Sequence, residues 1–338
     1  MRNIQGDVRQ ISLYYQKNIM DNIPNDFPVA PCYLEGYSKE EFIQGVFGFR
    51  GMLDALFGRY VEYGAEREKD LDDVLEMLDI FGFYGVIDDC HVKLQYSDEL
   101  CKATKKARIT NIGKRLRVLE SVGFKFGDLD LDKFSLNEFE ILDVCYPESP
   151  FVCLAWSAFS KACQKLDRER TLFHCDYRVF QKSDPKAPKA MLSDCIGSLS
   201  EDDKLFIIGV DQYLIENGYK LDVHKHNLKG TYSHKKSGFP IVIFYINVNV
   251  FQVRIIADGI NKYFEFFKNL PQEILENCVS CADCVDCCPT CRGGMEFNLD
   301  RHYRKCRAKN FTFPVDNQNR EILRELIVQE CEARKEVG

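Results

Sequence analysis

The stretch GYKLDVHKHNLKGTYSHKKSGFPIVIFYINVNVFQVRII, residues 218–256, decides the fold of the C-terminal half of this chain. It contains four runs with the β-branched and aromatic composition of strands, separated by glycine, asparagine, serine or proline. The runs cover residues 219–227, 230–238, 239–246 and 250–256. Strands joined by such short connections pair antiparallel, because parallel pairing needs a long crossover. The stretch therefore predicts an antiparallel sheet.

A helix is predicted on each side of this sheet. Residues 200–218 read SEDDKLFIIGVDQYLIENG, where Ser200 can cap the helix toward Asp203. Residues 258–271 read DGINKYFEFFKNLP, which has an apolar stripe at helical spacing and ends at a proline. Together with the sheet, these helices predict an α+β domain over residues 171–270.

The N-terminal half is dominated by helical signals. Residues 38–64 read SKEEFIQGVFGFRGMLDALFGRYVEYG, and Ser38 with Glu41 forms a capping box at the start. Gly45, Gly48 and Gly51 recur at helical spacing, which predicts close packing against a second helix. Residues 109–136 read as a helix followed by two short strands, an order compatible with a winged helix. A mainly helical domain is therefore predicted over residues 1–170.

A basic segment, residues 102–117, precedes and enters this predicted helix. Lys105, Lys106, Arg115 and Arg117 are the residues in it that we select as phosphate contacts. The opposing interpretation is a solvated helix face, and the net charge of −7 favours it. DNA stays open as a partner but is not favoured.

Composition excludes several classes of protein. The chain has 338 residues with 45% hydrophobic and 29% charged residues, as soluble globular proteins do. The N-terminus lacks the apolar core of a signal peptide, and the longest apolar stretch is interrupted by polar residues. We therefore expect a cytoplasmic protein with no membrane partner. In a reducing compartment, the 16 cysteines are expected to be buried thiols or metal ligands and not disulfides.

The most informative motif is ENCVSCADCVDCCPTCRGGMEF, which starts at Glu276. One ligand scheme is the ferredoxin spacing C-x2-C-x2-C-x3-C-P, which would hold an iron-sulfur cluster; it uses Cys278, Cys281, Cys284 and Cys288. A second scheme pairs two C-x2-C units around zinc; it uses Cys278, Cys281, Cys288 and Cys291. A third scheme brings back a distant thiol through a hairpin; it uses Cys278, Cys287, Cys291 and Cys306. Spacing alone leaves all three schemes open.

The third scheme also carries a resemblance. The pattern C-x8-C-x-P-x-C-x2-G-x2-F followed by Y-x-K-C consists here of Cys278, Cys287, Pro289, Cys291, Gly294, Phe297, Tyr303, Lys305 and Cys306. It resembles the C-terminal pattern of a family of uncharacterised bacterial cytosolic proteins. The resemblance extends upstream through GINKYFEFFKNLP and, more weakly, FHCDYRVF and YPESPFVCLAWSAF, and so covers roughly the last two thirds of the chain.

This resemblance implies a structural zinc site and no activity. The implied ligands are Cys278, Cys287, Cys291 and Cys306, within a zinc-binding segment that covers residues 271–338 and ends in a helix. The additional cysteines of this chain, Cys281, Cys284 and Cys288, depart from the pattern and rank lower as ligands. They keep an iron-sulfur cluster open as the alternative cofactor.

No P-loop, G-x-S-x-G or H-E-x-x-H motif occurs in the chain. A closed four-thiolate site also leaves no coordination position for a substrate. We therefore predict a non-enzymatic, zinc-stabilised binding or regulatory protein whose ligand is an unknown small molecule or protein. The alternatives are a redox protein that uses an iron-sulfur cluster or a dithiol, and a DNA-binding transcriptional regulator.

Overall fold

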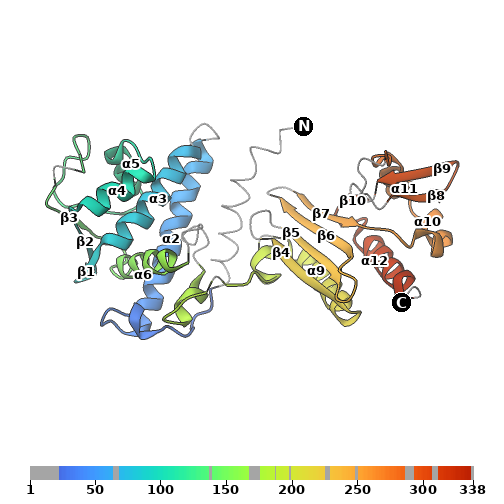
Figure 1. Ribbon diagram of the computed structural model, residues 1–338, viewed down its shortest axis with the longest axis horizontal. Helices are drawn as coiled ribbons and strands as arrows, with labels where there is room; N and C mark the ends of the chain where they lie inside the picture. Colours follow the sequence, from blue (N-terminus) through green and yellow to red (C-terminus); the bar gives the residue numbers. More distant parts are fainter. Residues whose placement is uncertain are drawn as a thin grey trace. The chain divides into compact units, whose positions relative to one another are not determined.

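The computed structural model describes residues 23–63, 68–136, 139–166, 176–186, 188–197, 199–224, 229–247, 250–285, 293–306 and 311–335. It is an α+β structure with antiparallel sheets (Figure 1). The described residues form two compact units, residues 23–189 and residues 190–335. The cysteine segment thus belongs to the same unit as the sheet predicted from residues 218–256. The expected boundary near residue 170 falls among residues 167–175, outside the described residues.

The first unit is mainly helical. Its elements are η2 (Pro31–Tyr33), α2 (Lys39–Tyr63), α3 (Glu68–Tyr84), β1 (Val86–Asp88), β2 (His91–Gln95), α4 (Asp98–Lys106), α5 (Ile112–Glu120), β3 (Ile141–Val144), α6 (Val152–Lys165) and η4 (Tyr177–Gln181). Helix α6 is almost entirely buried and packs against both α2 and α3 (Figure 1). The Trp156 ring lies in this core, and its indole Nε1 donates to the Leu78 carbonyl at 2.8 Å.

Helix α2 begins at the predicted capping box. The Glu41 amide donates to Ser38 Oγ at 3.2 Å, and the Ser38 amide donates to Glu41 Oε2 at 2.8 Å. The Ser38 amide and the Ser38 hydroxyl both donate to Glu41 Oε2, and these two bonds hold the pKa of the Glu41 carboxyl below its usual value. The glycine prediction is confirmed at Gly45, where an added Cβ would lie 2.2 Å from the Phe151 carbonyl oxygen. It is wrong at Gly51, which has nothing within 4 Å.

A three-stranded antiparallel sheet with the order β1-β2-β3 packs against α3 and α6. Strands β1 and β2 form a hairpin whose turn residues Asp89 and Cys90 both have positive φ, as a two-residue hairpin turn requires. Strand β3 pairs with β2, and Cys145 just beyond it pairs with Lys125. Chain segments on both sides of α4 and α5 therefore meet in one sheet.

The second unit contains the main sheet. Its elements are α8 (Ser193–Ile196), α9 (Glu201–Glu216), β4 (Tyr219–His224), β5 (Lys229–His234), β6 (Pro240–Asn247), β7 (Val250–Ile255), η5 (Ile260–Lys262), α10 (Phe264–Lys268), α11 (Gln272–Ser280), β8 (Gly294–Asn298), β9 (His302–Cys306), β10 (Thr312–Pro314) and α12 (Arg320–Lys335). The four predicted strands are confirmed as β4 to β7, all paired antiparallel with their neighbours. Strand β10 completes the sheet order β10-β7-β6-β5-β4.

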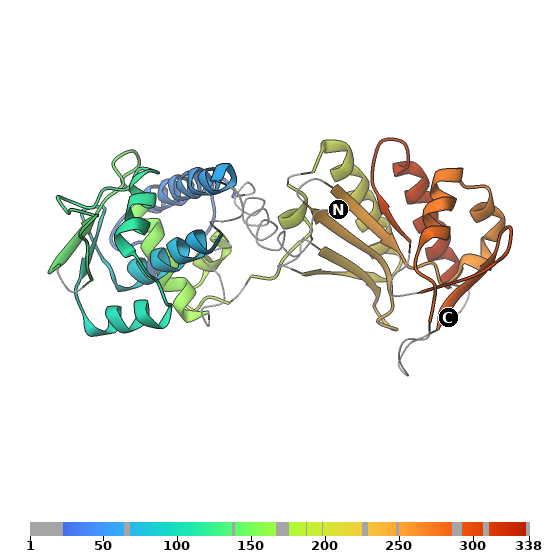
Figure 2. The ribbon, with the colours of Figure 1, turned by 90° about the horizontal axis from the view of Figure 1, so that it is seen from above.

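One face of this sheet is covered by α9 and α12, which contact each other (Figure 2). Residues that face them across the strands are fully buried, as Tyr232, Phe244 and Val253 illustrate. The neighbouring residues Thr231, Ile243 and Arg254 alternate with them and are only half-buried. The main sheet is thus amphipathic, with its apolar face under the two helices.

A buried ion pair joins α12 to the sheet. The Glu330 side chain is fully buried and accepts hydrogen bonds from the Gly259 amide, the Tyr263 hydroxyl and Arg334 Nε. Arg334 in turn donates to the carbonyl oxygens of Pro240 at 2.8 Å and Ile256 at 2.5 Å. These bonds connect the last turns of α12 with the start of β6 and the end of β7.

Among the described residues, no helix is both long and apolar enough to cross a membrane.

Candidate metal centre

The cysteine segment is organised by a small sheet. Strands β8 and β9 form the predicted hairpin, with Gly294 opposite Cys306. Asp283 pairs with Lys305 on the other edge of β9. The Cys284 amide donates to the Arg304 carbonyl and the Cys306 amide donates to the Ala282 carbonyl, each at 2.9 Å. Residues 282–284 therefore act as a third strand, and β9 lies in the middle.

One face of this small sheet carries Cys284 and Cys306. Side chains opposite each other in an antiparallel pair share a face, as do those two residues apart on one strand. Cys284 is opposite Arg304, and Arg304 is two residues before Cys306. Gly294 lies on the same face, where an added Cβ would be only 2.8 Å from Cys284 Cβ. Glycine at position 294 thus lets the edge carrying Cys284 close over the hairpin.

The other face of the hairpin is apolar and packs against the rest of the unit. Its residues Met295, Phe297 and Tyr303 are buried. The Phe297 ring centroid lies 5.3 Å from that of Phe267 in α10 and 6.1 Å from that of Phe311. The hairpin is therefore anchored by its own aromatic side chains.

Cys281 lies on the side of Lys305. The Lys305 ammonium is nearly buried and donates to the Cys281 carbonyl at 2.9 Å and to Asp283 Oδ1 at 2.7 Å. The Cys281 thiol donates to the Asn277 carbonyl at 3.4 Å. Burial raises the pKa of this thiol, and the nearby Lys305 charge opposes the rise. Cys281 therefore lies on the opposite side of the small sheet from Cys284 and Cys306.

Cys278 lies deeper still, within α11. Its side chain is fully buried, and burial raises the pKa of its thiol well above the usual value. It lies close enough to Tyr263 to raise the pKa of that phenol as well, although burial and Glu330 raise it more. Its surroundings are those of a core thiol between α11 and the Glu330 network.

The structure thus sorts the described cysteines of this segment into two environments. It brings Cys284 and Cys306 to one face and leaves Cys278 and Cys281 on the core side. Cys287, Cys288 and Cys291 lie outside the described residues. Within the described ranges, no three His, Cys, Asp or Glu side chains are grouped as metal ligands. The ferredoxin spacing places its first cysteine inside a helix, where a cluster-wrapping loop would be needed.

The four residues selected as phosphate contacts are in different situations. Lys105 and Lys106 are exposed in the last turn of α4. Arg117 forms an ion pair with Asp132, at 2.8 Å from Nε to Oδ1. Arg115 is buried, and its guanidinium donates to Asp73 at 2.9 Å. Arg115 is therefore part of the core of the first unit and not of its surface.

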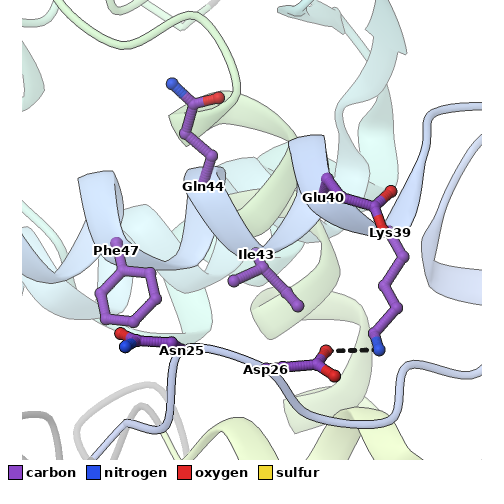
Figure 3. A pocket seen from close by; sticks show the side chains of 7 residues that line it. All are labelled: Asn25, Asp26, Lys39, Glu40, Ile43, Gln44 and Phe47. Carbon is purple, nitrogen blue, oxygen red and sulfur yellow. Dashed lines mark ion pairs between the residues drawn. The ribbon is translucent and has the colours of Figure 1, made fainter.

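A pocket of about 480 Å³ lies at the start of α2 (Figure 3). Its residues are Asn25, Asp26, Lys39, Glu40, Ile43, Gln44 and Phe47. Ile43 and Phe47 point toward the segment carrying Asn25 and Asp26, and Lys39 pairs with Asp26 beside them. Lys39 and Asp26 neutralise each other, and Glu40 and Gln44 point away from the segment carrying Asn25 and Asp26, so these described polar groups do not converge as those of a ligand site do.

Comparison with known proteins gives no match: none was found among protein-family models, curated proteins or solved structures. The resemblance of the cysteine pattern to a bacterial family therefore stays a prediction.

Proposed function

We propose that this chain is a non-enzymatic binding or regulatory protein whose C-terminal unit contains a structural zinc ion bound by four cysteine thiolates. The observation that carries the proposal is the position of Cys284 and Cys306 on one face of the small sheet, beside Gly294. Thiolates are the ligands that structural zinc prefers, and such sites commonly combine a C-x2-C pair with distant thiols.

The geometry favours one change in the ligand set. Cys287 follows Cys284 by three residues, and Cys291 precedes Gly294 by three residues. Both are therefore tethered by short chain segments to the face that carries Cys284 and Cys306. We infer that Cys284 is the fourth thiolate in place of Cys278, whose side chain is buried in the core of the unit.

The proposed role of the metal is to link the end of the segment 282–284 to the hairpin of β8 and β9. Strand pairing fixes residues 282–284, and the aromatic side chains fix β8 and β9. A four-thiolate site would link these two ends of the cysteine segment, and its closed coordination sphere serves stability. This role supports a binding or regulatory protein over a metalloenzyme.

Elemental analysis of the full chain, purified without added metal, tests this proposal. We expect about one zinc ion per chain and no visible colour. Cys284→Ser and Cys306→Ser should each lose zinc, and Cys278→Ser should retain it. Cys32→Ser, an exposed thiol in the first unit, is the control. Zinc loss in Cys278→Ser with retention in Cys284→Ser would restore the pattern-based ligands, whereas iron with acid-labile sulfide would replace the proposal with a redox protein.

A DNA-binding regulator is the second candidate, because of the order of elements in the first unit. Strand β2, helices α4 and α5, the segment at Lys125 and β3 follow each other as in a winged helix. Strand β2 pairs with β3, and Lys125 pairs with Cys145 just beyond β3. Arg115 and Arg117 already form ion pairs within the first unit, so they are less available to phosphate groups, which weakens this candidate. Retention on DNA that falls with salt and disappears in a Lys105→Ala, Lys106→Ala variant would support it. Absence of retention at low salt would exclude it.

A further inference from the structure

Helix α9 exposes large apolar side chains on the side away from the sheet. Leu205 is 68% exposed, Ile208 is 46% exposed and Ile215 is 39% exposed. On the opposite side of the same helix, the side chains of Phe206, Ile207, Val210 and Leu214 are buried in the core of the unit. The helix is therefore apolar on two sides, which is unusual for a surface helix whose outer face meets only water.

The exposed residues follow a coiled-coil spacing. Leu205, Ile208, Gln212 and Ile215 are separated by three, four and three residues, which is the a–d–a–d pattern of two heptads. All four lie on the exposed side of α9. The spacing reads the same in both directions, with residue 210 as its midpoint. A seam with this symmetry is complementary to itself when two copies run antiparallel.

We propose that this seam is the contact of a homodimer, in which two α9 helices pack antiparallel about a two-fold axis near residue 210. In this arrangement, Leu205 packs on Ile215 of the partner subunit, and Ile208 packs on Gln212 of the partner subunit. Each contact occurs twice, so the most exposed apolar side chains of the helix become buried together.

Gly209 lies next to the axis and leaves room for the second helix. A Cβ added there meets only the end of the Arg324 side chain, at 3.9 Å. The glycine is therefore not needed for packing within the subunit, although it lowers the helix propensity of α9. Close approach of a partner helix gives it a role.

The charges beside the seam favour the antiparallel direction. Antiparallel packing brings Lys204 toward Asp211 of the partner subunit, whereas parallel packing would place Asp211 beside Glu216 of the partner subunit. On the other flank, Glu216 of the partner subunit approaches Asp202, an unfavourable contact that Arg320 reduces only in part, because it lies 3.8 Å from Asp202 and 2.8 Å from Asp203. Lys204 also pairs with Glu201 of its own helix at 2.7 Å, so the charges rank the antiparallel direction above the parallel one, and the apolar seam itself provides the attraction between the copies.

A single helix pair buries less than the roughly 1,600 Å² of a standard interface. The dimer is therefore expected to dissociate on dilution. Sedimentation equilibrium of the full, metal-retaining chain over a range of concentrations measures this directly, and the result does not depend on the identity of the metal.

Three variants test the seam and its direction. Leu205→Lys should weaken association at least about tenfold, because the charge would be desolvated twice per dimer. Gly209→Gln should also weaken it, since the free subunit has room for an added Cβ at this position, whereas the longer side chain would block the axis. Gln212→Leu should tighten association about tenfold, because it extends the apolar seam opposite Ile208. Ile141→Lys is the matched control and should have no effect, because Ile141 is an apolar residue of the first unit that is 55% exposed.

A chain that stays monomeric at its highest soluble concentration would overturn the proposal, and so would an unchanged dimer in Leu205→Lys. A dimer that is lost in Leu205→Lys but unaffected by Gly209→Gln and Gln212→Leu would overturn the antiparallel arrangement. Circular dichroism of each variant must match that of the parent chain, so that a loss of dimer is not a loss of fold.

Discussion

Replacing Arg334 by methionine should destabilise the second unit strongly, and more at neutral than at acid pH. Arg334 neutralises the fully buried Glu330 carboxylate, with 2.6 Å between Nε and Oε1. Removing one partner of a buried ion pair costs about 3–5 kcal/mol, because the other charge is left without compensation. The carbonyl groups of Pro240 and Ile256 also lose donors, so the upper part of this range is expected.

The pH dependence follows from the pKa of Glu330. Burial already raises this pKa above the usual value of 4.5, and Arg334 is the largest influence that lowers it. Without Arg334 the pKa rises further. A carboxyl group with a raised pKa in the folded state favours folding below its unfolded pKa and loses that contribution as the pH rises through the folded pKa. The deficit of the variant should therefore be smaller near pH 4.5, where mainly the donors lost by the two carbonyl groups contribute, and reach its full size at neutral pH.

Urea unfolding at two pH values provides the assay. The single tryptophan, Trp156, reports the first unit by fluorescence, while circular dichroism reports both units. Unfolding of the second unit is the transition seen by circular dichroism but not by fluorescence, and its midpoint should move to lower urea concentration in Arg334→Met. The midpoint of the Trp156 fluorescence transition should not change.

Two further variants complete the test. Adding Glu330→Leu to Arg334→Met should recover part of the loss, because the unpaired charge is gone. Lys335→Met breaks only an exposed pair with Glu332 and should cost less than about 1 kcal/mol. A deficit in Arg334→Met that is equal at both pH values, or that doubles in the double variant, would refute the reasoning.

Five other variants test the first unit by thermal unfolding. Gly45→Ala should destabilise it by about 1–3 kcal/mol through overpacking, whereas Gly51→Ala should stabilise it by up to about 1 kcal/mol, and equal effects would contradict the packing. Arg115→Gln should cost about 3–5 kcal/mol and Arg117→Gln less than about 1 kcal/mol, because only the first pair is buried. Ser38→Ala should cost about 1 kcal/mol through loss of the helix cap, and an unchanged melting temperature would show that the cap is dispensable.

Elements with a strong local signal could be predicted from the sequence. The caps at Ser38 and Ser200 lie where the pattern places them, and each accepts the expected backbone hydrogen bond. Strands β4 to β7 could be predicted because each run is short, β-branched and separated from the next by turn residues. These signals are carried by neighbouring residues, so tertiary contacts are not needed to recognise them.

The hairpin β1–β2 shows where such signals fail. Its turn has Asp89 and Cys90 at positive φ, where asparagine and glycine are the usual residues. Because Cys90 stands where glycine is usual, no turn motif in the sequence predicts this hairpin. In addition, the apolar residue Val86 is exposed in this hairpin. The alternation of apolar and polar residues that would identify a half-buried strand is therefore missing there.

The position of Arg115 along its helix indicates that it is buried, although the basic composition of the segment suggests a surface residue. It is three residues after Ile112 and four before Leu119, so it falls on the apolar face of α5. Because Arg115 belongs to a basic run, its charge favours the prediction of a phosphate contact over that of a buried residue. The buried carboxylate of Asp73, which makes this placement possible, comes from α3 and cannot be inferred from α5 alone.

The choice of metal ligands depends on strand register, which spacing along the chain does not contain. Cys281 and Cys284 belong to the same C-x2-C unit, yet an extended backbone turns them to opposite sides. The pairing of Asp283 with Lys305 then determines which of them shares a face with Cys306. A shift of that pairing by one residue would exchange the two cysteines, because side chains alternate with a period of two. The ligand set that we propose therefore depends on the pairing of β9 with residues 282–284. If the proposed zinc site exists, a Lys305 substitution that alters this pairing should change zinc retention without removing a thiol.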